Sequence, residues 1–237
     1  MSAEDIVLDA TPTGQKFRVS IKVVPRTTQE TTIARMLSSK HVSGNPNNHC
    51  VPVLDVLPDP LNSSNALLVM PYLRPFNDPP FEVVEEVMDF IRQTLEGLSF
   101  IHSQGVAHRE GESPYVLGAK GADLDAPELS NVFPYNPYML DIFILGHVYE
   151  SQILQTYHGL SFLEPLIAAM MLVQPERRPT ASAALRMFSD IRRNLNHTHL
   201  HWRLRRRSET GTERVVYDTI SAAKMGFSLM RKGLMGT

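Results

Sequence analysis

Three ionisable side chains stand in succession at His108-Arg109-Glu110: an imidazole, a guanidinium and a carboxylate. Groups of these kinds exchange protons with substrates or hold anionic ones. A helical pattern leads into them, and Gly105 is placed to close that helix because glycine readily adopts a left-handed backbone. The short apolar step Val106-Ala107 then delivers the triplet. The sequence therefore predicts a loop at residues 108–110 that is positioned by the preceding helix.

This triplet resembles the H-R-D catalytic loop of protein kinases, in which the Asp accepts the proton of the substrate hydroxyl. By that resemblance His108 and Arg109 would build the loop, and Glu110 would take the place of the base. The carboxylate of Glu110 lies one methylene further out than that of an Asp. A misplacement of about 1 Å can cost about 10²-fold in rate, so the acid type is kept while its reach changes.

Another charged residue, Lys22, lies within an alternating apolar and polar stretch that predicts a β-strand over 17–24. Val19-Ser20-Ile21-Lys22 resembles the kinase V-A-I-K strand, whose Lys binds phosphate. The alternative is a lysine on the solvated face of an edge strand. Glu30 lies at the start of a short predicted helix. One alternative is that it anchors Lys22; the other is that it complements the helix dipole as a first-turn acid. Both alternatives stay open at this point.

Two further strands are predicted at 51–57 and 66–70, joined by a Pro- and Asn-rich turn. In a kinase the second of these leads into the hinge beside the adenine ring. The resemblance then makes Met70 the gatekeeper and places backbone groups from Pro71 to Leu73 against the nucleotide. Because Pro71 has no N–H, it can offer only its carbonyl.

A long helix over residues 81–102 is the most periodic feature of the chain. Its apolar residues form one face with a helical repeat. They are Val84, Val87, Met88, Ile91, Leu95, Leu98 and Ile101.

The residues after Glu110 depart from the kinase pattern. The loop motif H-R-D-x-x-x-x-N would place a Mg²⁺-binding Asn five positions on, where Tyr115 stands, and no D-F-G follows. The nearby acids Asp123 and Asp125 lie in a Gly-rich polar loop and are interpreted as solvated surface residues. Only 15 residues separate Glu110 from Ala126, so a block that a kinase would have there is missing. No metal site is predicted.

Downstream, Ala126-Pro127-Glu128 resembles the A-P-E motif that closes a kinase activation segment. The resemblance implies an ion pair between Glu128 and Arg178, which lies in a stretch similar to kinase D-P-x-x-R-P-T. Asp141, in a predicted helix over 137–150, would accept hydrogen bonds from the backbone of the 108–109 turn, since a buried carboxylate needs such partners. These three residues are expected to be structural, and Thr180 to cap the helix that follows.

The segment 192–237 differs in composition. An arginine cluster around Trp202 is followed by a predicted amphipathic helix over 213–234. One interpretation is docking on an acidic partner; nucleic-acid binding is not favoured. The alternating His197, His199 and His201 have no Cys or acid beside them, which argues against a metal site.

Composition sets broad limits. The chain has 237 residues, 43% of them hydrophobic, and a net charge of −2. Near-neutral charge gives no general case for nucleic acid. The single Cys50 cannot form an internal disulfide, and the sequence shows no signal peptide and no apolar run of about 18 residues. These features predict an intracellular protein, cytoplasmic or nuclear, that does not bind membranes.

The order of the motifs, rather than any one of them, identifies a resemblance to the protein kinase superfamily over residues 5–191. Stretches such as Asn48–Pro60 also resemble protein kinase-like domains common in basidiomycete fungi. The resemblance implies an α+β, two-lobe fold: a small β-rich lobe at about 1–70 without the Gly-rich loop, and a helical lobe at about 76–191, followed by the tail at 192–237.

For intact members the resemblance implies ATP, Mg²⁺ and phosphoryl transfer to Ser or Thr of a protein. This chain keeps Lys22 for ATP and lacks the usual Mg²⁺ ligands. We therefore expect a domain impaired in catalysis, a pseudokinase that binds or regulates a protein partner. The alternative is an active Ser/Thr kinase whose sequence here is incomplete, with Glu110, Asp123 or Asp125 recruiting Mg²⁺.

Overall fold

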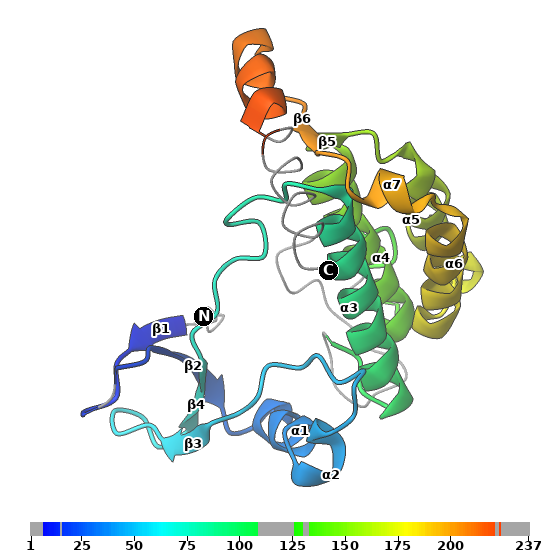
Figure 1. The fold of residues 1–237 in the computed structure, drawn as a ribbon. Coiled ribbons are helices and arrows are strands. Elements are labelled where there is room, and N and C mark those ends of the chain that lie inside the picture. The colour runs from blue at the N-terminus through cyan, green and yellow to red at the C-terminus, as the bar shows by residue number, and fades with distance from the viewer. Residues whose placement is uncertain (1–6, 15, 109–125, 130–132, 221–222, 224–237) are drawn as a thin grey trace, which may run out of the picture.

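The computed structural model describes residues 7–14, 16–108, 126–129, 133–220 and 223. Arg109, Glu110, Asp123 and Asp125 lie outside the described residues. Figure 1 shows a small sheet with two short helices on one side of the long helix α3, and α4, α5 and α6 on its other side. This is the two-lobe α+β arrangement that the sequence predicts. No described helix combines the length and apolar composition needed to cross a membrane.

The small lobe is an antiparallel sheet with strand order β1-β2-β4-β3. Lys22 on β2 lies opposite Leu68 on β4, and Ser20 lies opposite Met70. Val24, Ala66 and Leu68 share the face of Lys22 and are buried. The strands are β1 Val7–Ala10, β2 Val19–Pro25, β3 Asp55–Pro58 and β4 Asn65–Pro71.

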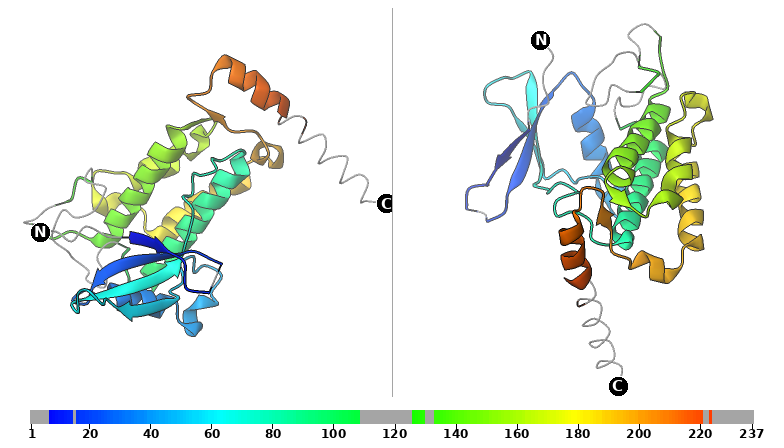
Figure 2. Two further views of the ribbon diagram at one scale, coloured as in Figure 1. Left: turned by 90° about the vertical axis from the view of Figure 1, so that its left-hand side faces the viewer. Right: turned by 90° about the horizontal axis from the view of Figure 1, so that it is seen from above.

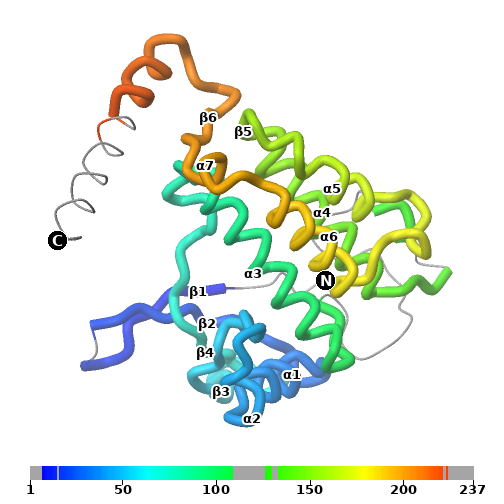
Figure 3. Tube along the Cα trace, turned by 45° about the vertical axis from the view of Figure 1, so that its right-hand side comes forward, coloured from blue at the N-terminus to red at the C-terminus, as the bar shows by residue number. Residues whose placement is uncertain are grey.

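Two short helices join this sheet to the helical lobe. α1 (Glu30–Leu37) and α2 (Lys40–Ser43) follow β2. The polar, turn-rich composition of residues 38–49 predicts a loop, so α2 is a helix that the sequence does not predict. Ile33, Leu37 and Val42 pack against the core of the helical lobe. The two lobes are thus joined by apolar contacts. The tube in Figure 3 shows α1 beside the C-terminal end of α3.

The helical lobe forms around α3 (Val84–Ser103). All seven residues predicted for its apolar face are at most 8% exposed. The Glu86 carboxylate accepts hydrogen bonds from the backbone N–H groups of Glu82 and Val83, which fixes the start of the helix. At its end Gly105 has φ 77°, and Val106 N–H bonds to Ile101 O, so the predicted glycine stop is confirmed.

The helix that contains Asp141 is α4 (Pro137–Tyr149), and it is buried on several sides. Asn136 caps its start through a hydrogen bond from Tyr138 N–H. Gly146 faces α5 (Glu164–Met170), and a Cβ at this position would lie 2.9 Å from both Met170 Cβ and Met171 Cγ. Glycine therefore lets α4 and α5 approach each other closely.

The rest of the lobe covers α3 from the far side. α6 begins at Ala181, where the Thr180 hydroxyl accepts a hydrogen bond from Ala183 N–H, as predicted. The remaining elements are the π-helical turn η1 Glu150–Leu154, β5 Tyr157–His158, the 3₁₀ turns η2 Ser161–Leu163 and η3 Pro175–Arg177, α6 Ala181–Asn194, α7 His197–Leu200 and β6 Arg205–Arg206.

The segment after 192, which the sequence places in a separate tail, is partly integrated into this lobe. Leu200 and Leu204 belong to the core cluster, and Leu204 N–H bonds to Glu82 O at the start of α3. β6 pairs with β5. A helix over 211–220 then stands off the body of the protein (Figure 2).

Candidate functional site

Lys22 and Glu30 form an ion pair, with Lys22 Nζ 2.7 Å from Glu30 Oε1. The side chains are 22% and 39% exposed. The geometry follows from the sheet: Lys22 projects from the face that α1 approaches, and Glu30 is the first residue of α1. Glu30 is thus both the partner of Lys22 and an acid in the first turn of α1. The two alternatives that the sequence leaves open for Glu30 are therefore both true. The carboxylate fixes the position of the ammonium group.

The predicted hinge continues from the same sheet. Met70 and Pro71 end β4, and Pro71 lies opposite Val19. Tyr72 N–H then bonds to Arg18 O, and the Arg18 guanidinium lies 4.0 Å from the centre of the Tyr72 ring. Leu73, the next residue, is 58% exposed. Met70 and Pro71 are thus part of β4, whereas Leu73 lies in the exposed segment that follows the strand.

Asp141 on α4 ties the end of α3 to the turn that follows it. Its Oδ2 accepts hydrogen bonds from His108 N–H at 2.7 Å and from His102 Nε2 at 2.9 Å. Asp141 is 4% exposed; a carboxylate so deeply buried needs such donors. The contact with the His108 backbone is the one that the sequence predicts, and the His102 contact is one that it misses.

Arg178 and Glu128 form a second, buried ion pair. Arg178 Nη2 donates to Glu128 Oε2 at 2.8 Å while Nη1 contacts Oε1, so the pair is bidentate. The side chains are 0% and 7% exposed. Arg178 also donates to the carbonyls of Leu172 and Met139. The pair therefore fixes the 126–129 segment against the helical lobe, as the A-P-E and R-P-T resemblances imply.

A cleft of about 1630 Å³ runs along α3. Leu73 from the predicted hinge and His108 from the predicted loop both line it, together with Asp141. Lys22, Glu30 and Met70 are not among its lining residues. Aromatic side chains form part of its wall, with the rings of Phe76 and Phe90 stacked 4.6 Å apart. The structure therefore brings the predicted site residues together in two groups, one on the sheet and one at this cleft.

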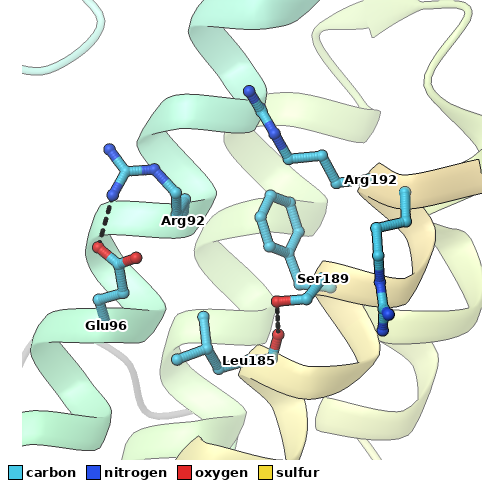
Figure 4. Close-up of a pocket in the computed structure, with 7 residues that line it drawn as sticks. Arg92, Glu96, Leu185, Ser189 and Arg192 are labelled. Carbon is cyan, nitrogen blue, oxygen red and sulfur yellow. Dashed lines mark hydrogen bonds and ion pairs between the residues drawn. The ribbon is translucent and has the colours of Figure 1, made fainter. Parts of the chain in front are cut away.

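A smaller hollow of about 430 Å³ lies between α3 and α6 and contains none of the predicted site residues. Figure 4 shows its polar groups bonded to each other: Arg92 to Glu96, and the Ser189 hydroxyl to Leu185 O. Nη1 of Arg192 is buried there without a hydrogen-bond partner among the described residues. These internal contacts leave the hollow as a feature of helix packing.

The tail arginines do not form the single basic cluster that the sequence predicts. Arg203 donates to both carboxylate oxygens of Glu209, at 3.0 and 2.7 Å, and to Asp218 Oδ1 at 2.8 Å. Hydrogen bonds from Arg203 lower the pKa of both carboxyl groups, and those acids in turn raise the pKa of Arg203. The sequence signal for this arrangement was weak, because Asp218 lies 15 positions after Arg203.

Comparison with known proteins finds similarity to solved structures only. No family model matches the chain, and no curated protein matches it. Among 883 matching chains of solved structures is the crystal structure of the Mycobacterium tuberculosis PknI kinase domain. The sequences are 15% identical, the match covers 80% of this chain and 91% of that chain, and the TM-score is 0.47.

Proposed function

We propose that this chain is a protein kinase-like domain, of the kind common in basidiomycete fungi, that is impaired in phosphoryl transfer and acts as a binding or regulatory module for a protein partner. The ion pair between Lys22 and Glu30 carries the proposal, because it holds an ammonium group on the covered face of the sheet. An ammonium so positioned can bind a phosphate group of ATP. Met70, Pro71 and Leu73 would then face the adenine.

The residues of the helical lobe support the same assignment. The Asp141 contact to His108 N–H and the Glu128–Arg178 pair both hold backbone segments in place. These contacts maintain the frame around His108. By the kinase resemblance, Glu110 would stand where a kinase has its base. Contacts of this type are structural and do not themselves transfer a phosphoryl group.

Catalytic impairment rests on the sequence. Phosphoryl transfer depends on positioning and on metal ions that neutralise the developing charge. The sequence has Tyr115 where the Mg²⁺-binding Asn would stand, has no D-F-G, and has no G-x-G-x-x-G before Lys22. A domain of this composition would hold ATP through Lys22 and turn it over slowly or not at all.

Nucleotide binding and turnover should be measured separately. Thermal unfolding of the full chain with millimolar ATP, with and without Mg²⁺, is expected to show stabilisation that Lys22→Ala removes. Lys40→Ala is a matched control, because Lys40 lies exposed on α2. Phosphate transfer to a generic protein substrate is then expected to stay at background.

The outcomes separate this proposal from the alternative of an active Ser/Thr kinase. Robust transfer that Lys22→Ala abolishes would reject impairment and favour the active enzyme, with Glu110, Asp123 or Asp125 as candidate Mg²⁺ ligands. Absence of any ATP effect on unfolding, in the wild type and under both metal conditions, would reject the nucleotide site itself.

A further inference from the structure

Ser208 lies in an exposed turn directly after three arginines, in the sequence Arg205-Arg206-Arg207-Ser208. The turn is closed by a hydrogen bond from Glu209 N–H to Arg206 O at 3.2 Å. It connects β6 to the 211–220 helix. The serine is therefore accessible. Its neighbours anchor the turn: Arg207 N–H bonds to Thr156 O at 2.9 Å and Arg207 Nε to Leu154 O at 3.0 Å, while Glu209 binds Arg203.

The two residues that precede this turn are presented in an extended conformation. Arg205 and Arg206 form β6, which pairs with β5, and both are exposed. Their guanidinium groups stand three and two positions before the serine. Acidic pockets of arginine-directed protein kinases read such charge patterns on extended substrates. We propose that Ser208 is a phosphorylation site for an arginine-directed Ser/Thr kinase, and that its phosphate releases the 211–220 helix.

A second stretch of the same type shows that the structure, and not the motif alone, selects Ser208. Arg177-Arg178-Pro179-Thr180 also places two arginines three and two positions before a hydroxyl. There Arg178 is fully buried in its pair with Glu128, and the Thr180 hydroxyl accepts the capping hydrogen bond from Ala183 N–H. Presenting Thr180 to a kinase would require both contacts to break.

Thr210 follows Arg207 by three positions. It is less suited than Ser208 as a phosphorylation site, because its hydroxyl is already hydrogen-bonded. Its N–H and its hydroxyl both donate to Glu213 Oε2, at 2.9 and 2.8 Å, and the hydroxyl accepts a hydrogen bond from Glu213 N–H at 3.4 Å. This reciprocal arrangement caps the 211–220 helix. The hydroxyl of Thr210 is thus engaged in starting the helix.

The modification is an ordinary phosphoryl transfer from Mg²⁺-bound ATP on the modifying kinase. The Ser208 Oγ forms a bond to the γ-phosphorus as the bond from that phosphorus to the β,γ-bridging oxygen breaks. The hydroxyl proton passes to the base of the modifying kinase, and ADP leaves. The reaction is independent of the nucleotide site proposed above for this chain.

The consequence follows from how the helix is attached. Asp218 on the helix is held by Arg203 at 2.8 Å and lies 3.6 Å from Arg205. Four apolar helix residues remain exposed: Val215, Val216, Tyr217 and Ile220. Ion pairs near the chain's surface, more than apolar burial, therefore hold this helix against the body of the protein.

A phosphate on Ser208 would compete for those arginines. It adds about −1.5 to −2 charges and three acceptor oxygens, next to Glu209, which already binds Arg203 through two contacts. Asp218 is the weaker competitor because it is a single carboxylate, 41% exposed. The phosphate is expected to displace Asp218 from Arg203 and Arg205 and so to detach the helix.

The site is tested with the full chain, ATP and a purified arginine-directed Ser/Thr kinase, with peptide mass spectrometry to locate the phosphate. Ser208 is expected to carry it, and Ser208→Ala or Arg205→Ala with Arg206→Ala should lower incorporation about tenfold or more. Arg193→Ala is the matched control, since Arg193 is exposed and has no hydroxyl three positions on. Equal incorporation into Ser208→Ala, or phosphate on Thr180 instead, would overturn the assignment.

Helix release is tested by hydrogen exchange on the phosphorylated and unmodified chains. Amides of the 211–220 helix are expected to exchange about tenfold faster after phosphorylation. Asp218→Asn should give the same increase without phosphate and show little further change with it. Unchanged exchange in a stoichiometrically phosphorylated chain would reject the release step.

Discussion

Two arginines of this chain each bind a carboxylate through two contacts, yet their surroundings differ. Arg178 is fully buried, and so nearly is its partner Glu128. Arg203 binds Glu209 in the same bidentate way and adds Asp218, which is 41% exposed. The first pair fixes a segment within the helical lobe, whereas the second attaches a helix that stands off it.

The difference shows how burial decides what an ion pair does. Removing one member of a buried pair leaves an uncompensated charge, which is costly, whereas exposed pairs contribute little to global stability. A buried pair is therefore suited to fixing the fold permanently. A pair with an exposed member can be exchanged for another anion at low cost, which suits reversible attachment.

The largest effect is expected from Arg178→Met. Glu128 would keep its charge in a buried site and two backbone carbonyls would lose a donor, so unfolding free energy should fall by about 3–5 kcal/mol. Denaturant unfolding followed by circular dichroism measures this. Adding Glu128→Leu should recover part of the loss, because the stranded charge is then gone. A single variant as stable as the wild type would show that the buried pair does not hold the lobe.

A smaller effect is expected from Arg203→Met. The Glu209 carboxylate, 8% exposed, would lose its partner, but the helix that Arg203 attaches contributes little burial, so global unfolding free energy should fall by less than for Arg178→Met. Hydrogen exchange in the 211–220 helix should nevertheless accelerate. A global loss as large as that of Arg178→Met would remove the distinction between the two arginines.

The smallest effect is a dependence on pH. Because the pKa of Asp218 and of Glu209 is lowered in the folded chain, mainly by Arg203, attachment should be at full strength above about pH 4. It should weaken as the pH falls through the lowered pKa values. The ring signals of Tyr217, whose ring lies 5.8 Å from Arg203 Cζ, can be followed by NMR from neutral to acidic pH. Asp218→Asn should reduce the transition; an identical titration in that variant would contradict this assignment.

Local patterns predicted those parts of the fold that depend on neighbours in the sequence. The apolar face of α3 and the glycine stop at Gly105 follow from helical periodicity and backbone sterics. The contact of Arg178 with Glu128 was expected from the order of motifs, and that of Lys22 with Glu30 was one of two alternatives; both contacts are present. Their roles toward a nucleotide stay predictions.

Other features depend on contacts between distant segments, which single-sequence patterns do not reveal. Leu200 and Leu204 lie in a polar stretch, yet they enter the core because their backbone pairs with the start of α3. Similarly, Arg203 was grouped with its neighbouring arginines, although its partners lie further along the chain. Periodicity also gave no signal for the single-turn helix α2.

The contact between α4 and α5 at Gly146 has a consequence for the turn that carries His108. α4 holds the Asp141 oxygen that receives the His108 amide, and α5 limits how far α4 can move toward it. The position of Asp141 Oδ2 therefore depends on Gly146. A methyl group added at Gly146 would push α4 away from α5, and the turn that contains His108 would be displaced together with α4.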